Sequence, residues 1–277
     1  MYRRILTPVI FIFLAGFTAG RAENVKDLAK STKYLALGDS VAFGYTPLAR
    51  KPGDLKDYSG YPDIVSKGAH LQVANASCFG ETAGHFLNLS APDTGCAGWR
   101  SMFPLFADYS GTQMDYAVDY LAQSKKAELV TIDLGINDLG LLLAACGGDS
   151  ACFGAGAPLV LNTYGANLAA IFGRIRFVAG YTGPIVAVTI YSNTSDSTVA
   201  GPIGALNEVL TSVAPGFGVQ IADAFTAFAV ASAPFGGDSC AAGLLIPLPA
   251  GGCDIHPSAA GQALIAQTIL DLLPSKK

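Results

Sequence analysis

The sequence lacks several features that define whole classes of protein. It has no cluster of Lys or Arg, no CxxC motif, and no cysteine at zinc-finger spacing from a histidine. The first absence argues against nucleic acid or an anionic surface as the main partner. The other two argue against a metal site. Repeats, low-complexity tracts and linkers are also missing, so we expect one domain.

The N-terminal 22 residues resemble a bacterial export signal. A positively charged start, Tyr2-Arg3-Arg4, precedes an apolar run over Ile5–Phe17, and Gly20-Arg21-Ala22 offers small residues for cleavage. The run is shorter than the roughly 20 apolar residues that a membrane span needs, although a retained N-terminal anchor is the alternative. We therefore predict a signal peptide over 1–22 and a mature domain over 23–277.

Cleavage would leave an acidic chain, since three of the 17 basic residues and none of the 21 acidic ones lie in the signal. We expect a secreted or periplasmic protein that makes no stable membrane insertion after cleavage. The sequence leaves its oligomeric state open, and we favour a monomer.

Six cysteines in an exported chain indicate disulfides. They form three couples of neighbours along the sequence. Fifteen pairings are possible for six cysteines; we predict the three neighbour pairs, Cys78–Cys96, Cys146–Cys152 and Cys240–Cys253.

Short apolar runs alternate with helical patterns along the chain. This alternation predicts an α/β fold with a parallel sheet, because parallel strands are covered on both faces. The strands are expected over Tyr34–Leu37, Leu71–Ala76, Leu129–Leu134, Pro184–Ile190 and Val219–Ala222, and helices over Leu159–Val178, Pro202–Val213 and His256–Leu273. Two long connections, 80–126 and 137–158, are typical of functional walls or lids.

Groups that can perform chemistry lie next to these predicted elements. Ser40 directly follows the first strand, Gly80 and Asn137 follow the second and third, and His256 begins the last helix. Ligands of an open α/β sheet bind outside the carboxyl ends of its strands. We therefore expect all four residues at one rim. The tripeptide Gly-Asp-Ser also occurs at 148–150 and 237–239, but there it lies in glycine-rich loops and predicts turns.

These four groups are suited to acyl transfer. Ser40 would be the nucleophile and His256 its general base. The backbone N–H groups of Ser40 and Gly80 and the side-chain amide of Asn137 would form the oxyanion hole. His85 is the rival base, although a role as a loop or pocket-wall residue is favoured. Asp39 is expected to support the turn that presents Ser40.

The blocks Leu37-Gly38-Asp39-Ser40, Ser77-Cys78-Phe79-Gly80, Gly135-Ile136-Asn137-Asp138 and Asp254-Ile255-His256-Pro257 resemble the markers of the GDSL, or SGNH, hydrolases. The resemblance implies a flavodoxin-like α/β/α sandwich with a five-stranded parallel sheet. It also implies ester hydrolysis through an acyl-enzyme, without a metal or organic cofactor.

One position departs from the family pattern. The acid usually lies three residues before the histidine, where this chain has Cys253, whereas Asp254 is two residues before it. A shift of one residue along an extended segment turns a side chain to the other face. We favour Asp254 as the third catalytic residue, reaching His256 through a turn. The alternative is a backbone carbonyl of residue 253 or 254 and a Ser–His dyad.

The substrate is less well defined by the sequence. The run Leu139–Ala145 and the aromatic residues near the marker blocks predict either an apolar acyl pocket or ordinary core packing. We expect a small-molecule or lipid ester as substrate, hydrolysed by an esterase or lipase. One alternative is a carbohydrate acetylesterase with an open groove near Trp99. The second is a non-catalytic secreted binding protein.

Overall fold

A computed structural model describes residues 31–124, 126–194 and 196–274. The predicted signal peptide and the boundary at residue 23 lie outside the described residues. In the described part of the chain, no helix is both long and apolar enough to cross a membrane.

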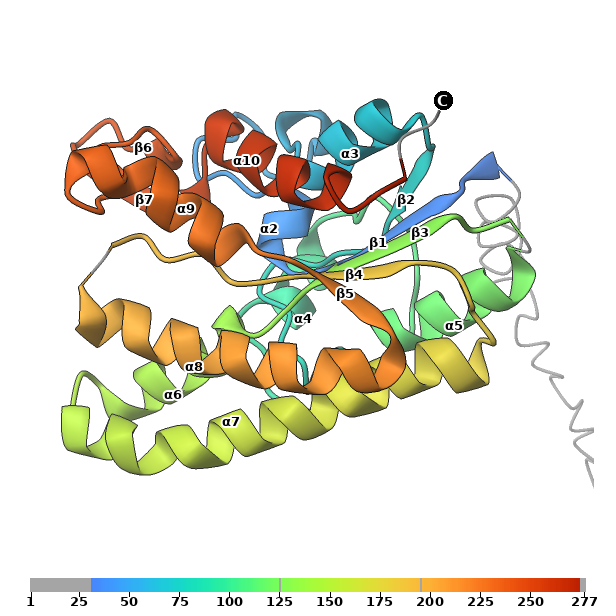
Figure 1. Ribbon diagram of the computed structural model, residues 1–277, viewed down its shortest axis with the longest axis horizontal. Coiled ribbons are helices and arrows are strands. Elements are labelled where there is room, and N and C mark those ends of the chain that lie inside the picture. Colours follow the sequence, from blue (N-terminus) through green and yellow to red (C-terminus); the bar gives the residue numbers. More distant parts are fainter. Residues whose placement is uncertain (1–30, 125, 195, 275–277) are drawn as a thin grey trace, which may run out of the picture.

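A five-stranded parallel sheet forms the centre of the molecule, in the order β2-β1-β3-β4-β5 (Figure 1). This is the strand order of the flavodoxin-like fold, and the prediction of five parallel strands is confirmed. The strands are β1 (Tyr34–Gly38), β2 (Val73–Asn75), β3 (Leu129–Asp133), β4 (Ile185–Val188) and β5 (Val219–Ala222).

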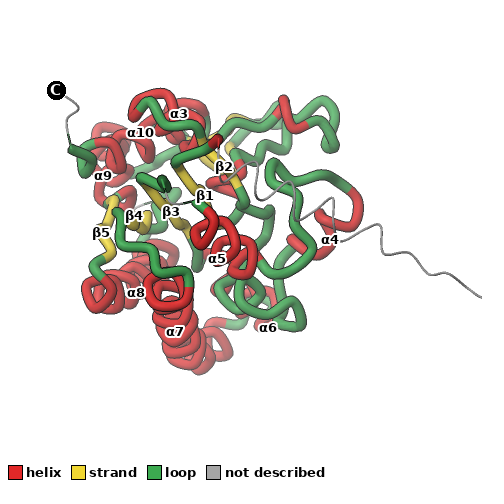
Figure 2. The backbone as a smooth tube through the Cα atoms, turned by 90° about the vertical axis from the view of Figure 1, so that its right-hand side faces the viewer, coloured by secondary structure: helices red, strands yellow, loops and turns green. Residues whose placement is uncertain are grey.

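Two layers of helices cover the sheet, so the predicted α/β/α sandwich is confirmed. One layer contains α3 (Tyr61–Ala69), α9 (Ala224–Ser232) and α10 (Ala259–Leu270). The other contains α5 (Gln113–Gln123), α7 (Ser150–Gly173) and α8 (Ser197–Val213). Figure 2 shows the two layers on opposite faces of the sheet.

Strand β1 illustrates why the strands are apolar throughout. Tyr34 and Ala36 pack into the core beneath α3, α9 and α10, whereas Leu35 and Leu37 pack into the core beneath α5, α7 and α8. Successive side chains of a strand point to opposite faces, and here both faces are buried.

The predicted helix limits need correction. Helix α7 begins at Ser150 and continues through Pro158 into a π-helical turn, Arg174–Val178. Helix α8 begins at Ser197 because Asp196 caps it, so Pro202 lies inside the helix. Helix α10 begins only at Ala259, since its predicted first residue, His256, belongs to a strand.

The two long connections also contain helices that were not predicted. These are α4 (Cys96–Met102) and α5 in the first, and α6 (Ile136–Cys146) with the start of α7 in the second. The remaining elements are α2 (Ser40–Phe43), an antiparallel pair β6 (Leu245–Pro247) and β7 (Cys253–Pro257), and short 3-10 turns at Leu55–Asp57, Ala214–Phe217 and Ala233–Phe235.

Three disulfides link neighbours in the sequence. They are Cys78–Cys96, Cys146–Cys152 and Cys240–Cys253, the same pairs that the sequence predicts. The first ties the segment after β2 to α4, the second closes the turn between α6 and α7, and the third anchors the start of β7.

Candidate active site

Ser40 lies on a sharp turn between β1 and α2. Gly38 has a φ of 140°, and a Cβ atom there would lie 2.3 Å from Asp133 Oδ1, so both conformation and space require glycine. Asp39 caps the helix by accepting a hydrogen bond from Val41 N at 2.9 Å. The expected role of Asp39 in supporting this turn is therefore seen. The turn leaves Ser40 at the carboxyl edge of the sheet.

In the structure, Ser40, His256 and Asp254 are connected by a chain of two hydrogen-bond contacts. His256 Nε2 is 2.9 Å from Ser40 Oγ, and His256 Nδ1 is 2.5 Å from Asp254 Oδ1. Asp254 Oδ1 also accepts a hydrogen bond from the His256 backbone N–H at 2.9 Å. This is the arrangement that a nucleophile, a base and an orienting acid require.

Strand β7 explains how Asp254 reaches the imidazole. We expected a turn to bring Asp254 to His256, but the segment is extended and pairs with β6. Residues two apart on a strand share a face, so Asp254 and His256 point the same way while Ile255 points outward and is 58% exposed. Tyr191 also holds the strand, because its hydroxyl donates to the Ile255 carbonyl at 2.7 Å.

Gly80 and Asn137 lie at the same edge. Gly80 has a φ of 74°, and its carbonyl accepts a hydrogen bond from Thr94 N at 3.0 Å. Among the described residues, no hydrogen bond involves the N–H of Gly80. Asn137 Nδ2 donates to Asp39 Oδ2 at 3.2 Å and to the Glu81 carbonyl at 3.0 Å, and Thr94 Oγ1 donates to Asn137 Oδ1 at 2.7 Å. To donate to a ligand oxygen, Asn137 Nδ2 would therefore have to release its hydrogen bond to Asp39 Oδ2 or to the Glu81 carbonyl.

His85 is not placed to act as the base. Its Nδ1 is 2.5 Å from Glu81 Oε1, within a buried pair. Burial raises the pKa of Glu81 and this hydrogen bond opposes the rise, while the same bond raises the pKa of His85. Gln113 continues the network, because its Nε2 donates to Glu81 Oε2 at 3.1 Å and its Oε1 accepts from Gly38 N at 2.6 Å. The pair thus braces the loop near Gly80 and the turn before Ser40.

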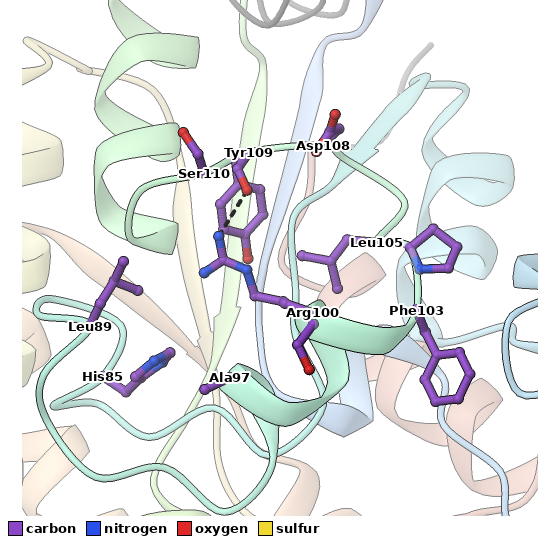
Figure 3. Close-up of a pocket in the computed structure, with 11 residues that line it drawn as sticks. His85, Leu89, Ala97, Arg100, Phe103, Leu105, Asp108, Tyr109 and Ser110 are labelled. Atoms are coloured by element: carbon purple, nitrogen blue, oxygen red, sulfur yellow. Dashed lines mark hydrogen bonds between the residues drawn. The ribbon is translucent and has the colours of Figure 1, made fainter. Parts of the chain in front are cut away.

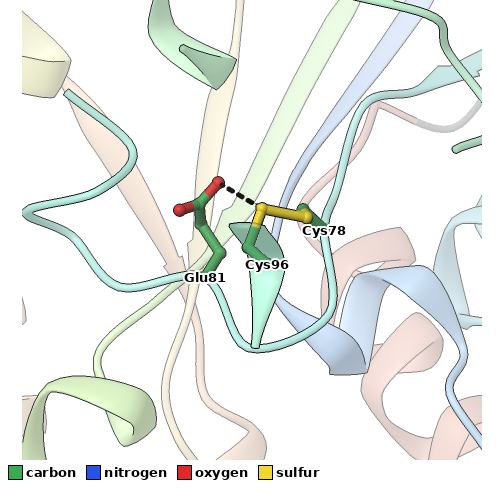
Figure 4. A group of neighbouring side chains, drawn as sticks. All are labelled: Cys78, Glu81 and Cys96. Atoms are coloured by element: carbon green, nitrogen blue, oxygen red, sulfur yellow. Dashed lines mark hydrogen bonds between the residues drawn. A yellow bond between two sulfur atoms is a disulfide. The ribbon is translucent and has the colours of Figure 1, made fainter. Parts of the chain in front are cut away.

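One group of described residues has the donor atoms of a metal site: Cys78, Glu81 and Cys96 (Figure 4). The two sulfur atoms are bonded to each other, so neither is a thiolate ligand. Glu81 Oε2 contacts Cys96 Sγ at 3.6 Å, but a disulfide sulfur carries no proton to donate. The geometry is that of a buried disulfide beside a carboxyl group.

Several carboxyl groups behind Ser40 are held away from water. Burial raises the pKa of Asp39 to about 6 and that of Asp138 to about 7. The pKa of Asp133 is raised well above its usual value by burial and by the nearby Asp39. Tyr61 donates to Asp133 Oδ1 at 2.7 Å. Burial and the neighbouring Asp39 therefore both favour the neutral form of the Asp133 carboxyl group.

An apolar cavity of about 390 Å³ opens beside Ser40. Helix α6 contributes Gly140 and Leu143, and helix α8 contributes Val199 and Ile203. Ile136, Val188, Ile190 and Ile255 add further apolar surface. Among the aromatic residues near the site, Phe79 lines this cavity and also packs against Trp99. Phe43 and Trp99 are buried in the aromatic cluster behind it.

A second cavity, of about 460 Å³, is lined in part by residues of α4 (Figure 3). His85, Arg100 and Tyr109 line it, but neither Ser40 nor His256 does. The Arg100 guanidinium donates to the carbonyls of Tyr109 and Gly111 and lies 4.6 Å from the centre of the Tyr109 ring. Arg100 therefore has a structural role, and this cavity lacks the pair of Ser40 and His256.

Three residues of the site were not found from the sequence. Each makes a hydrogen bond to a residue far away in the sequence. Gln113 bonds to Gly38, which is 75 positions away, Thr94 bonds to Asn137, which is 43 positions away, and Tyr191 bonds to Ile255, which is 64 positions away. No local pattern marks such contacts. Gln113 does lie within a capping box formed by Thr112 and Asp115, which is a sequence signal for the start of α5.

Comparison with known proteins matches this chain to one family. The profile of the GDSL-like lipase/acylhydrolase family matches residues 36–264, a segment that contains Ser40, Gly80, Asn137, Asp254 and His256. No match was found among curated protein sequences.

Solved structures share the fold at low sequence identity. A phospholipase A1 from Streptomyces albidoflavus NA297 is 22% identical, with a TM-score of 0.56, covering 87% of this chain and 98% of its own. An acetylxylan esterase from Geobacillus stearothermophilus is 17% identical, with a TM-score of 0.53 and coverage of 87% and 93%. A protein described as a putative GDSL-like lipase, from Parabacteroides merdae, is 13% identical, with a TM-score of 0.53 and coverage of 86% and 93%.

Proposed function

This chain belongs to the GDSL-like lipase/acylhydrolase family, and we propose that it is an exported serine esterase or lipase that hydrolyses aliphatic carboxylic esters. The proposal rests on a chain of two contacts beside an apolar cavity. Ser40 Oγ lies 2.9 Å from His256 Nε2, and His256 Nδ1 lies 2.5 Å from Asp254 Oδ1.

In the first half of the reaction, Ser40 Oγ attacks the ester carbonyl while its proton passes to His256 Nε2. Asp254 holds the proton on Nδ1 and stabilises the imidazolium. The tetrahedral intermediate collapses as the C–O bond to the alcohol breaks, and His256 returns the proton to the leaving alcohol. A water molecule then repeats the sequence on the acyl-enzyme, releasing the carboxylic acid and free Ser40.

The developing oxyanion would be stabilised by the N–H groups of Ser40 and Gly80 and by the Asn137 amide. The N–H of Ser40 is in the first turn of α2, where backbone donors lack partners within the helix. The Asn137 amide would exchange its bond to Asp39 or to the Glu81 carbonyl for the oxyanion. Removing one such donor typically lowers turnover by about 100- to 1,000-fold.

The cavity supports an aliphatic acyl group over a sugar acetate. A polysaccharide site presents exposed aromatic residues along a groove, but Trp99 is only 8% exposed and packs in an aromatic cluster. A carbohydrate acetylesterase would use the same pair of Ser40 and His256, but it does not explain the apolar lining of the cavity. A non-catalytic binding protein does not explain the contact between Ser40 and His256. Three disulfides among the described residues are consistent with an oxidising compartment and so support export.

The first test compares wild type with Ser40→Ala on p-nitrophenyl esters from acetate to palmitate. We expect the variant to lose at least about 10,000-fold in turnover and to resist fluorophosphonate labelling, with little change in Tm. Ser150→Ala is the matched control, because Ser150 is also in a Gly-Asp-Ser tripeptide but is exposed at the start of α7. Hydrolysis retained by Ser40→Ala would refute the assignment of the nucleophile.

A further inference from the structure

The mouth of the acyl cavity is surrounded by exposed apolar side chains. Leu143 of α6, Val199 of α8 and Ile255 of β7 all line the cavity, yet they are 54%, 40% and 58% exposed. We call these three residues the apolar rim. They come from separate parts of the chain, and at these three side chains the apolar lining beside Ser40 reaches the molecular surface.

Helix α6 extends this surface. A helix at the surface normally turns charged residues to solvent, but the outer side of α6 carries Leu143, Ala144 and Ala145, all exposed. Its one charged residue, Asp138, points inward, where its Oδ2 accepts a hydrogen bond from Ala83 N. The exposed face of α6 is therefore apolar.

The charge distribution around the rim distinguishes between kinds of partner. No Lys or Arg occurs between Lys126 and Arg174, or between Arg176 and Lys276. Helix α6, helix α8 and strand β7 all lie within these two stretches, so the rim has no basic residue on its own elements. Attraction to anionic lipids depends on clustered Lys and Arg, which leaves insertion of apolar side chains as the means of contact.

We infer that the apolar rim docks on an uncharged lipid surface, so that an ester in a lipid aggregate passes its acyl chain directly into the cavity. This inference rests on the proposed function, because it assigns the acyl cavity to the substrate. It narrows the substrate class to esters presented by a net-uncharged lipid–water interface. Continuity between rim and cavity lets the chain move from lipid to Ser40 without crossing water.

The test measures binding rather than catalysis. Ser40→Ala protein, which cannot consume the lipid, is sedimented with phosphatidylcholine vesicles with and without added phosphatidylglycerol. Adding Leu143→Ser and Val199→Ser should weaken binding about tenfold or more, since two apolar side chains no longer enter the lipid. Adding the anionic lipid should not strengthen binding.

Phe177→Ser with Val178→Ser, in the same Ser40→Ala background, is the matched control. These two side chains are 78% and 64% exposed, more than those of the rim, and they precede β4, at the opposite edge of the sheet. We expect this control to bind as the parent does. An equal loss in the control, no loss in the rim variant, no binding by the parent, or binding that requires phosphatidylglycerol would overturn the inference.

Failure of the proposed function is measured separately. Hydrolysis of dissolved p-nitrophenyl acetate by wild type requires no lipid surface. A protein that hydrolyses the acetate but ignores vesicles retains the proposed function and loses this inference. A protein that binds vesicles through the rim but never hydrolyses esters loses the proposed function.

Discussion

Asp254 and His256 are two residues apart on a strand, and this spacing decides which group orients the imidazole. A carboxylate three residues before the histidine would need a bend to reach Nδ1, whereas one two residues before it lies on the same face. Asp254 Oδ1 accepts from both the ring and the backbone N–H of His256. The same oxygen thus fixes the tautomer and the orientation of the base.

Asp254→Asn should therefore lower turnover on p-nitrophenyl butyrate by about 100- to 10,000-fold, because an amide does not stabilise the imidazolium and favours the wrong tautomer. Steady-state kinetics of the variant provides the measurement. The control is Asp238→Asn, which changes an exposed carboxylate that accepts hydrogen bonds only from local backbone N–H groups. Turnover near the wild-type value in Asp254→Asn would favour orientation by a backbone carbonyl.

At the scale of elements, the β6–β7 pair is the part of the site that lies outside the central sheet. Strand β7 carries both Asp254 and His256 but pairs only with the three-residue strand β6. The disulfide Cys240–Cys253 and the hydrogen bond from Tyr191 to the Ile255 carbonyl compensate for this short pairing. The position of the base therefore depends on a covalent link more than that of the nucleophile does.

Replacing Cys240 and Cys253 by Ser should cost about 2–4 kcal/mol of stability and also lower kcat, since β7 is then less firmly held. Thermal unfolding and p-nitrophenyl ester hydrolysis measure the two effects. The comparison variant combines Cys146→Ser with Cys152→Ser. It removes a disulfide between residues that are 6 positions apart in the sequence, whereas Cys240 and Cys253 are 13 positions apart. The Cys146–Cys152 pair lies in the α6–α7 turn, and we expect a smaller loss of stability and nearly unchanged kcat. Equal loss of kcat in both would contradict a specific role for the hairpin disulfide.

At the scale of the whole molecule, the buried carboxyl groups make stability depend on pH. The pKa of Asp39 is raised to about 6, that of Asp138 to about 7, and those of Glu81 and Asp133 are also raised, chiefly by burial. Between pH 4 and 7 the folded protein keeps protons that the unfolded chain releases. Stability must then fall as pH rises through this range.

The raised pKa of His85 acts in the same direction. The stability that the protonated imidazole contributes is lost as the pH rises through the pKa of His85 in the folded protein. The lowered pKa values of the carboxyl groups of Asp57, Asp115 and Asp196 matter only in more acidic solution. We therefore expect the Tm of the wild type to be highest in mildly acidic solution and to decrease toward pH 8.

Asp138→Asn tests this dependence. A pKa raised from 3.8 to about 7 corresponds to a loss of about 3 kcal/mol of stability between pH 5 and 8, and an amide does not titrate. As the pH rises, the free energy of unfolding of Asp138→Asn should therefore increase relative to that of the wild type. Asp196→Asn, at an exposed helix cap, should show a constant difference over the same range. A constant difference for Asp138→Asn as well would contradict the assigned pKa.

Features that depend on local pattern and on sheet topology could be predicted from the amino-acid sequence. Continuous apolar runs specify parallel strands buried on both faces. Because parallel strands end at a common edge, placing Ser40, Gly80 and Asn137 after three strands was enough to bring them together. Cysteines close in sequence are also close in space, which accounts for the three disulfide pairs.

The tertiary structure alone decided the features that depend on distant contacts. The reach of Asp254 follows from β7 pairing with β6, and Gln113 braces Gly38 across 75 positions. The limits of α7 and α8 also escaped the sequence, since both helices continue through a proline. The apolar cavity beside Ser40 combines residues of α6, α8 and β7 with residues of several other segments. An apolar run such as Leu139–Ala145 has the same composition whether it fills a core or lines a pocket, and only packing against its neighbours separates the two.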